Sequence, residues 1–211
     1  MTRNSGVPAQ PAESAGSEAS ARNGRVLVVC TGNVCRSPYM ERRLAQVLEG
    51  TGVEVVSGGT AALVGQGMDP GTAHELGQVG VSVVGFVSTQ VTAQRVGEAD
   101  LVLTAAREHR ATVAQLHAKA LRYCFTWADF ADLVDGLDPD GLGRPAPGQT
   151  WVSHVASLAA ARRGTVPPRS KEQSDILDPY RLGSEEFSRM ARQIEEDLPP
   201  IVAALSPPLR G

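Results

Sequence analysis

Short apolar runs alternate with stretches of helical periodicity along this chain, and this alternation limits the possible folds more than any other sequence feature. The first run, Arg25–Val29, is apolar and β-branched, which is typical of a strand buried on both faces of a sheet. The next stretch, Pro38–Glu49, places apolar residues at helical spacing and is followed by Gly50, a residue that commonly ends a helix. A buried strand followed at once by a helix indicates a parallel sheet with crossover helices.

The same pattern continues downstream. It predicts further strands at Val53–Ser57, Leu101–Thr104 and Leu121–Phe125. It predicts further helices at Thr72–Val79, Thr89–Ala99, Arg107–Ala118 and Ser184–Leu198. We expect Ser184 to cap the last helix and Pro199 and Pro200 to kink or end it. The predicted fold is therefore α/β: a doubly wound, four-stranded parallel sheet flanked by helices in three layers, as in Rossmann and flavodoxin-like folds.

Two segments differ in composition from the rest. Residues 1–24 are rich in Ala, Ser and Gly and contain no aromatic residue, so we expect a disordered tail. Residues 135–174 contain five Gly and five Pro, which predicts a loop-rich insertion with one helix at Trp151–Arg163. The remainder predicts one domain spanning residues 25–206.

Composition excludes several classes of protein. The 20 basic and 23 acidic residues give a net charge of -3, which argues against binding to nucleic acid or to acidic lipid through bulk charge. No apolar run approaches the roughly 18 residues of a membrane span, and the first twenty residues do not resemble a signal peptide. We therefore expect a cytoplasmic protein that contacts neither nucleic acid nor membrane. Three cysteines do not make a disulfide framework.

The segment 29–38, Val-Cys-Thr-Gly-Asn-Val-Cys-Arg-Ser-Pro, joins the first strand to the first helix and has the features of an anion site. Ser37 is expected to cap the helix, and Pro38 suits its first turn. Unpaired N–H groups and the positive end of the helix dipole then converge on the loop. Gly32 allows tight curvature of the backbone, and the guanidinium of Arg36 can hold two phosphate oxygens at once.

Cys30 lies in the middle of this positive field, which favours the thiolate, the nucleophilic form of cysteine. A nucleophile inside an anion cradle predicts attack on a phosphoryl group. Other interpretations fit the residues less well. A cysteine that ends a strand is often only packed, but the neighbouring anion-binding residues argue against that here. A zinc site would have only Cys35 and Cys124 to add, and the Gly-Lys-Ser/Thr of a nucleotide-binding loop is missing.

Residues 29–38 resemble the phosphate loop of the low-molecular-weight protein tyrosine phosphatases, and Asp178-Pro179-Tyr180 resembles the acid loop of that family. Residues 125–130 are similar to bacterial members from actinobacteria. The resemblance implies a phosphoric monoester hydrolase, a protein-tyrosine phosphatase that works through a phosphocysteine intermediate. It further implies a phosphotyrosine-containing protein as substrate and no metal or other cofactor.

The resemblance also implies residue roles. Cys30, Arg36 and Asp178 would be catalytic, with Asp178 as general acid and then base. The phosphate-binding loop would comprise Thr31, Gly32, Asn33, Val34, Cys35 and Ser37. Ser57 would support that loop, and Tyr180 would line the substrate cleft. Cys35 would form a reversible disulfide with the nucleophile.

Some features leave alternatives open. Asp175 is a second candidate for the acid, and Phe86 and Thr89 stand where the family usually has a histidine and an arginine. Two other functions on the same fold compete: an arsenate reductase, for which Cys124 is the only cysteine downstream of the loop, and a non-catalytic phosphate-binding module.

Overall fold

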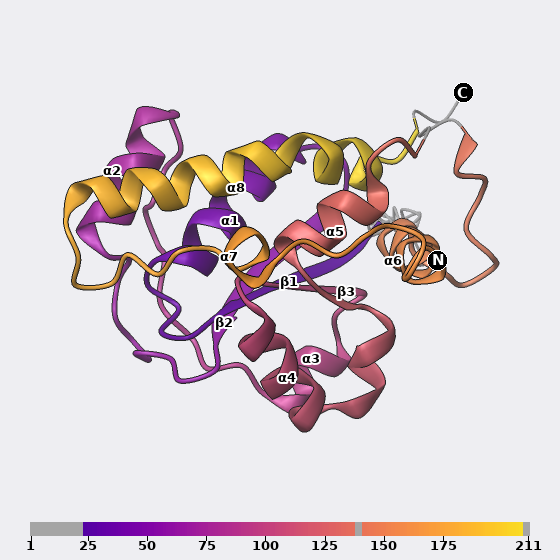
Figure 1. Ribbon diagram of the computed structural model, residues 1–211, viewed down its shortest axis with the longest axis horizontal. Coiled ribbons are helices and arrows are strands. Elements are labelled where there is room, and N and C mark those ends of the chain that lie inside the picture. Colours follow the sequence, from indigo (N-terminus) through magenta and orange to yellow (C-terminus); the bar gives the residue numbers. More distant parts are fainter. Residues whose placement is uncertain (1–22, 138–140, 209–211) are drawn as a thin grey trace, which may run out of the picture.

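The computed structural model describes residues 23–137 and 141–208 (Figure 1). Most of the expected tail, residues 1–24, lies outside the described residues, but Gly24 already belongs to the first strand. The boundaries of the single domain and of the insertion at 135–174 stay predictions.

One parallel sheet of four strands forms the centre of the molecule. Its strands are β1 (Gly24–Cys30), β2 (Val53–Gly59), β3 (Leu101–Thr104) and β4 (Cys124–Thr126). They lie in the order β2-β1-β3-β4, all parallel, with Val26 of β1 opposite Val55 and Leu101. The strand order reverses at β1, so the carboxyl ends of β1 and β3 border the crevice where such sheets bind ligands. The predicted α/β class and four-stranded parallel sheet are confirmed.

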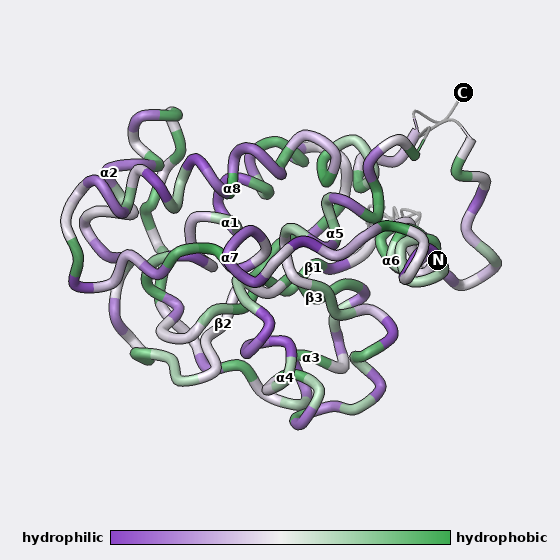
Figure 2. Tube along the Cα trace, in the orientation of Figure 1, coloured by the Kyte–Doolittle hydropathy of each residue, from purple (hydrophilic) through white to green (hydrophobic). Residues whose placement is uncertain are grey.

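Helices cover both faces of this sheet. They are α1 (Arg36–Val47), α2 (Pro70–Gln78), α3 (Ala93–Gly97), α4 (Arg107–Leu116), the 3₁₀ helix η1 (Ala118–Arg122), α5 (Trp127–Val134), α6 (Trp151–Ala161), α7 (Lys171–Ser174) and α8 (Ser184–Leu205). In Figure 1, α1, α5 and α8 lie on one side of the strands, and α3 and α4 lie on the other. The buried apolar residues correspondingly form one large and one small cluster. The hydrophobic strands of the centre contrast with the mixed colouring of the surface helices in Figure 2.

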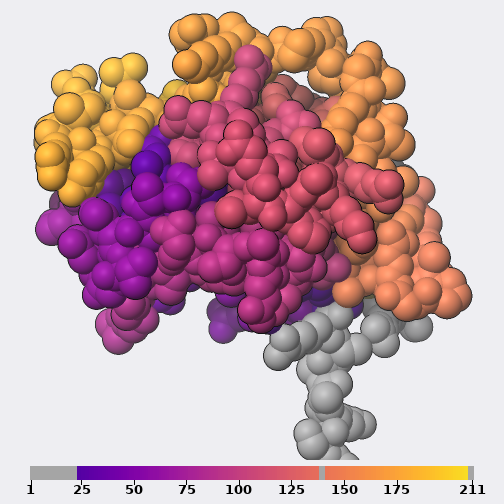
Figure 3. All heavy atoms as spheres, turned by 90° about the horizontal axis from the view of Figure 1, so that it is seen from below, coloured from indigo at the N-terminus to yellow at the C-terminus, as the bar shows by residue number. Residues whose placement is uncertain are grey.

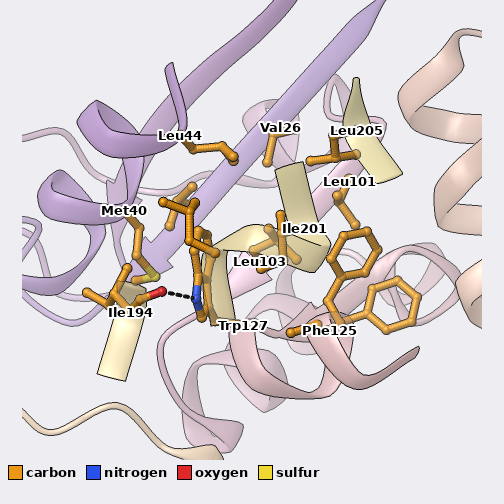
Figure 4. Packing of buried hydrophobic residues seen from close by; sticks show 14 of the residues in the cluster. Val26, Met40, Leu44, Leu101, Leu103, Phe125, Trp127, Ile194, Ile201 and Leu205 are labelled. Atoms are coloured by element: carbon orange, nitrogen blue, oxygen red, sulfur yellow. Dashed lines mark hydrogen bonds between the residues drawn. The ribbon is translucent and has the colours of Figure 1, made fainter. Parts of the chain in front are cut away.

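The larger cluster is built around Trp127 of α5 (Figure 4). Its indole Nε1 donates a 3.2 Å hydrogen bond to the carbonyl oxygen of Ile194 in α8, so the polar atom of this fully buried ring has a partner. Apolar residues of β1, β3 and α1 belong to the same cluster, among them Val26, Leu103 and Met40. This packing fixes α8 against the sheet. It also fixes the acid-bearing segment, which is the stretch with Asp178 between α7 and α8.

The prediction for the cap of α8 is wrong, because Gly183, not Ser184, is the N-cap. Of the two outcomes expected at Pro199 and Pro200, an end of the helix is excluded, since α8 continues to Leu205. Proline removes a helical hydrogen bond, but the residues beyond the prolines are strongly held. Ile201 and Leu205 are fully buried, and the indole of Trp151 donates to the carbonyl of Ala204. The gain from burying this last turn outweighs the local cost.

Other element boundaries also differ from prediction. The helix predicted at Thr89–Ala99 is reduced to the five residues of α3, because Thr89 and Gln90 continue in extended form beside the end of β2. The strand predicted at Leu121–Phe125 begins only at Cys124, since its first residues complete η1. Helices α5 and α7 were not predicted.

Candidate active site

The loop that follows β1 turns its carbonyl oxygens outward. Its carbonyls at residues 30, 31, 32 and 34 accept hydrogen bonds of 2.9–3.0 Å from the backbone N–H groups of Thr60, Ala61, Leu63 and Asp69. Gly59, which ends β2, makes this contact possible, because a side chain there would collide with the carbonyl of Thr31. Within the described part of the chain, no acceptor contacts the N–H groups of residues 31–35. These donors are therefore free to bind an anion.

Asn33 holds the loop in this shape. Its backbone is left-handed, with φ of 54°, a conformation that asparagine tolerates better than most residues. Its fully buried side chain donates to the hydroxyls of Ser37 (2.9 Å) and Ser57 (2.7 Å) and accepts from the backbone N–H of Thr89 (2.8 Å). All three polar positions of the amide group are thus used to fix the loop.

Ser37 does not cap α1 as predicted. The N-cap is Cys35, without a side-chain cap, and Ser37 lies inside the first turn. Its hydroxyl instead lies 3.0 Å from the sulfur of Cys30. With Asn33 donating to the same hydroxyl oxygen, the Ser37 proton is free to point at the sulfur. This arrangement gives the sulfur of Cys30 a hydrogen-bonding partner inside the loop.

Behind Ser57 lies the partly buried carboxylate of Glu41, a contact that the sequence did not indicate. The Ser57 hydroxyl donates to the carboxylate of Glu41. Burial raises the pKa of Glu41, and the charges of Arg42 and Arg95 oppose that rise. Arg95 also donates to the Ser57 carbonyl (2.8 Å) and to the hydroxyl of Thr89 (2.5 Å). Thr89 thus bonds directly to the loop through Asn33, and Arg95 holds Thr89 and Ser57 in place.

Arg36 joins the loop to the acid-bearing segment. Its side chain is only 5% exposed, and its Nη2 donates to Asp178 Oδ2 at 2.6 Å and to the Thr31 hydroxyl at 3.2 Å. Its Nη1 contacts the carbonyl of Ile176 at 3.4 Å. The N–H of Ile176 in turn bonds to the carbonyl of Ala105, directly after β3. The segment with Asp178 is therefore tied to the carboxyl edge of the sheet.

Asp178 and Asp175, the two candidate acids, lie in different surroundings. Asp178 borders the same cavity as Cys30, and its side chain is 48% exposed. Asp175 accepts a 3.0 Å hydrogen bond from the backbone N–H of Arg107 and is absent from the lining of that cavity. The geometry therefore favours Asp178 over Asp175 as the acid.

The cavity above the loop has a volume of about 150 Å³. Its walls are mostly apolar and include Val34, Ala61 and Leu63. Tyr180 forms part of the rim, is 39% exposed and packs against the guanidinium of Arg181. The cavity thus has a polar floor for an anion and apolar walls for the group that carries it.

His109 of α4 lies against the loop and was not predicted as part of the site. It is 2% exposed, and its Nε2 lies 2.8 Å from the hydroxyl of Thr31. Burial, and then the positive charge of Arg36, lower the pKa of His109 to about 4, so the ring is neutral near pH 7. Its i,i+4 spacing to the buried Val113 was the sequence signal for an inward-facing position.

The three cysteines are buried and free. Burial raises the pKa of Cys35 to about 12, helped by the charge of Asp69, so Cys35 is a neutral thiol beside the cavity. Burial likewise raises the pKa of Cys124 to about 12, which fits a packed side chain in β4. No set of three His, Cys, Asp or Glu side chains suited to a metal ion occurs among residues 23–137 and 141–208.

Comparison with known protein families identifies this chain. The model of the low molecular weight phosphotyrosine protein phosphatase family matches residues 25–145, more than half of the sequence. The chain belongs to this family. The loop around Cys30 therefore belongs to the part of the phosphatase that the family model matches, whereas Asp178 lies beyond it.

Individual relatives of this chain carry the name of the same family. The phosphatase is 39% identical to the low molecular weight protein-tyrosine-phosphatase Etp of Escherichia coli K12, over 81% of this chain and 86% of that protein. It is 27% identical to a putative low molecular weight protein-tyrosine-phosphatase of Klebsiella pneumoniae, over 81% of this chain and 90% of the relative.

Solved structures show the same fold. Wzb of Vibrio vulnificus, solved with benzylphosphonate, aligns with the phosphatase at a TM-score of 0.61 and 24% identity, covering 85% of this chain and 97% of Wzb. The YwlE arginine phosphatase of Geobacillus stearothermophilus also aligns at 0.61, with 23% identity, covering 85% and 90%. Within the described residues, none of the helices of the phosphatase is long and apolar enough to cross a membrane.

Proposed function

We propose that this phosphatase hydrolyses phosphotyrosine in a protein substrate through a phosphocysteine intermediate on Cys30. The observation that carries the proposal is the meeting of three groups at one cavity. Cys30 lines it with its sulfur beside the Ser37 hydroxyl, the buried Arg36 lines it too, and Asp178, a third lining residue, accepts a hydrogen bond from Arg36. Nucleophile, anion clamp and acid are the three parts that phosphoryl transfer to a thiolate needs.

In the first step, the Cys30 thiolate attacks phosphorus and the bond from phosphorus to the tyrosine oxygen breaks. The loop N–H groups and Arg36 hold the three equatorial oxygens, where negative charge collects in the transition state. Asp178 donates its proton to the leaving phenolate oxygen. The products of this step are tyrosine and phosphocysteine.

In the second step, a water molecule attacks the phosphorus of the phosphocysteine. Asp178, now a carboxylate, removes a proton from that water, the sulfur–phosphorus bond breaks and the Cys30 thiolate returns. Inorganic phosphate leaves with the oxygen of the water. The cycle is ping-pong, and every group it requires is a side chain or a backbone N–H of this chain.

The cavity favours an aryl phosphate. A flat ring fits between the apolar walls at Leu63 and the exposed ring of Tyr180, and aromatic groups gain free energy from such contacts. An arsenate reductase would need a thiol placed to relay a disulfide outward, and Cys124 is buried in β4, outside the cavity lining. We further propose a cytoplasmic location, because three unpaired cysteines suit a reducing compartment.

Para-nitrophenyl phosphate, assayed in the presence of a chelator, tests the proposal. We expect turnover that Cys30→Ser abolishes and Cys124→Ser preserves, because Cys30 lines the cavity and Cys124 does not. A phosphotyrosine peptide and a phosphoarginine peptide of the same sequence then test the substrate class, and the phosphotyrosine peptide should be preferred. Turnover that survives Cys30→Ser, or preference for phosphoarginine, would contradict the proposal.

A further inference from the structure

A second hollow, of about 330 Å³, lies outside the catalytic cavity and shares none of its lining residues. It lies between α4, α5 and residues 163–169, which are beyond the stretch matched by the family model. Figure 3, viewed from below the orientation of Figure 1, shows the pink residues of α4 next to the orange part of the chain that includes this segment.

The lining of this hollow is strongly basic. Four arginines and two aspartates contribute side chains to it, which leaves two positive charges in excess. The arginines are Arg107, Arg110, Arg163 and Arg169. The aspartates are Asp129 and Asp132. The rest of the wall is apolar and includes Phe125 and Pro167.

One of the four arginines is already neutralised. Arg169 forms two hydrogen bonds to Asp132, at 2.6 and 2.8 Å, and two to Asp197, at 2.8 and 3.1 Å. It is therefore a structural clamp between α5 and α8. Its two carboxylates are occupied, so Asp132 does not compensate the other arginines of the hollow.

The remaining three arginines have no carboxylate within salt-bridge distance among the described residues. Arg163 donates to the carbonyls of Leu121 and Cys124 and lies 4.1 Å above the ring of Phe125. The pKa of Arg163 is lowered by burial and then by the positive charge of Arg110, so the two guanidiniums repel each other. Arg110 has a buried Nε without a hydrogen-bond partner in the described structure.

We propose that this hollow is a second phosphate site, which binds the dianion between Arg110, Arg163 and Arg107. A dianion would remove the repulsion between the guanidiniums and bond to donors that the protein leaves free. Asp129 is the one carboxylate in the lining that does not already bond to Arg169; its charge acts on Arg163, but one carboxylate does not balance three arginines. The phosphoryl group is either free inorganic phosphate or part of a phosphorylated side chain on a protein substrate.

The site is linked to the acid-bearing segment by direct bonds. Arg107 uses its backbone N–H to hold Asp175 and its Nη2 to hold the carbonyl of Arg169, at 3.0 and 2.7 Å. The chain from Arg169 through Asp175 continues to Asp178, the proposed acid. An anion held by Arg107 therefore lies next to the segment that presents the acid to the catalytic cavity.

Titration of the whole protein with inorganic phosphate, at constant ionic strength set with chloride, tests the site. Amide NMR shifts at residues 107–110 and 163–166 report the hollow, and inhibition of para-nitrophenyl phosphate turnover reports the catalytic loop. Arg110→Met keeps the aliphatic stem and removes the charge. We expect it to weaken phosphate binding at the hollow, as measured by these shifts, about tenfold or more. The inhibition of turnover by phosphate should stay unchanged within about twofold.

Arg192→Met, on the exposed surface of α8, is the matched control for the loss of one arginine and should change neither measurement. Shifts at the hollow that persist in Arg110→Met, or that are absent from the wild-type protein, would overturn the proposal. A circular dichroism melt of each variant ensures that loss of the shifts is not loss of the fold.

Peptides distinguish the two sources of phosphate. If the ligand is carried by the substrate, a peptide with a second phosphorylated residue should show a higher kcat/KM than its singly phosphorylated counterpart, and Arg110→Met should remove the difference. If the ligand is free phosphate, the two peptides should react alike while the phosphate shifts remain. The peptide arm rests on the proposed phosphatase activity, whereas the phosphate titration does not, so the two can fail separately.

Discussion

Arg36 Nη2 donates a 2.6 Å hydrogen bond to Oδ2 of Asp178, although the two residues are 142 positions apart in the sequence. The guanidinium is buried and the carboxylate is half exposed. In the proposed reaction Arg36 must bind phosphate oxygens, so an incoming phosphate competes with Asp178 for the same donors. Substrate binding should thus release Asp178 from Arg36, and the freed carboxylate then takes up from solvent the proton that it donates to the leaving oxygen.

Asp178→Asn should therefore have two opposite effects. We expect kcat to fall by about 10²–10⁴-fold, because the leaving oxygen loses its proton donor. We also expect inorganic phosphate to bind more tightly, because Arg36 no longer has a carboxylate as competitor. Kinetics with aryl phosphates of graded leaving-group strength measure the first effect, and inhibition by phosphate measures the second.

Asp175→Asn is the control for that experiment. Asp175 bonds to the N–H of Arg107 rather than to Arg36, so its loss should reduce stability without making the rate depend more on the leaving group. If Asp175→Asn and not Asp178→Asn changed the leaving-group dependence, the assignment of the acid would be wrong.

Cys35 should determine whether oxidative inactivation is reversible. A sulfenic acid on Cys30 would condense with the neighbouring Cys35 thiol to form a disulfide, with loss of water, and a dithiol reductant would restore both thiols. We expect peroxide-treated wild-type protein to regain activity and Cys35→Ser to stay inactive. Because burial raises the pKa of Cys35 to about 12, disulfide formation should become faster as pH rises. Equal recovery of both proteins would contradict this role.

His109→Gln should remove a pH-dependent part of the stability. The pKa of His109 is lowered to about 4 in the folded protein, against about 6.5 in an unfolded chain. Between these values the unfolded state binds the additional proton, so the wild-type protein loses stability as pH falls from 6.5 toward 4. The loss attributable to this ring is at most on the order of 3 kcal/mol.

Urea unfolding at pH 7.5, 5.5 and 4.5 measures this effect. The stability difference between wild type and His109→Gln should be largest at pH 7.5 and should shrink at the lower values. A difference that stays constant with pH would mean that His109 contributes packing alone. Glutamine is suitable because it keeps a polar group within reach of the Thr31 hydroxyl.

Arg95→Met should destabilise the phosphate-binding loop without changing the lining of the catalytic cavity. It removes the donors to the Ser57 carbonyl and the Thr89 hydroxyl, and it leaves Glu41 with one fewer nearby positive charge. We expect a kcat about tenfold lower, KM nearly unchanged, and a stability loss of about 1–3 kcal/mol. The pKa of Glu41 should rise further, which moves the acid limb of the kcat profile to higher pH.

Arg95→Lys tests whether the charge or only the packing matters. It keeps the positive charge near Glu41, so part of the lost activity and the original position of the acid limb should return. If the acid limb of the kcat profile does not move in Arg95→Met, the protonation of Glu41 does not affect the reaction through Ser57.

The sequence was a good guide to features encoded by neighbouring residues. The strand–loop–helix around Cys30 was predictable because burial pattern, glycine and arginine all lie within a few positions of each other. The role of Ser37 as helix cap was wrong, because its hydroxyl faces Cys30 and Asn33 instead. The preference of serine for the N-cap position was outweighed by the contacts that the Ser37 hydroxyl makes inside the loop.

Contacts between distant segments could largely not be predicted from the sequence. His109 reaches Thr31 across 78 positions, and Arg95 reaches Ser57 across 38, and neither pairing leaves a periodic signal in the sequence. The continuation of α8 past Pro199 and Pro200 depends on the burial of Ile201 and Leu205 in the core, which outweighs the local preference of proline. Residues 164–169 were predicted only as loop, and their position beside α4 could be learned only from the three-dimensional structure.

The contacts of the site join residues at very different distances along the chain, and this affects the order in which the site forms during folding. The contact between Cys30 and Ser37 closes a segment of only seven positions, whereas that between Arg36 and Asp178 spans 142. Short closures cost less chain entropy and form sooner than long ones. A folding intermediate with β1, β2 and α1 formed but α8 not yet docked would contain most of the phosphate-binding loop and lack Asp178. We therefore expect phosphate binding to develop before catalysis as the chain folds.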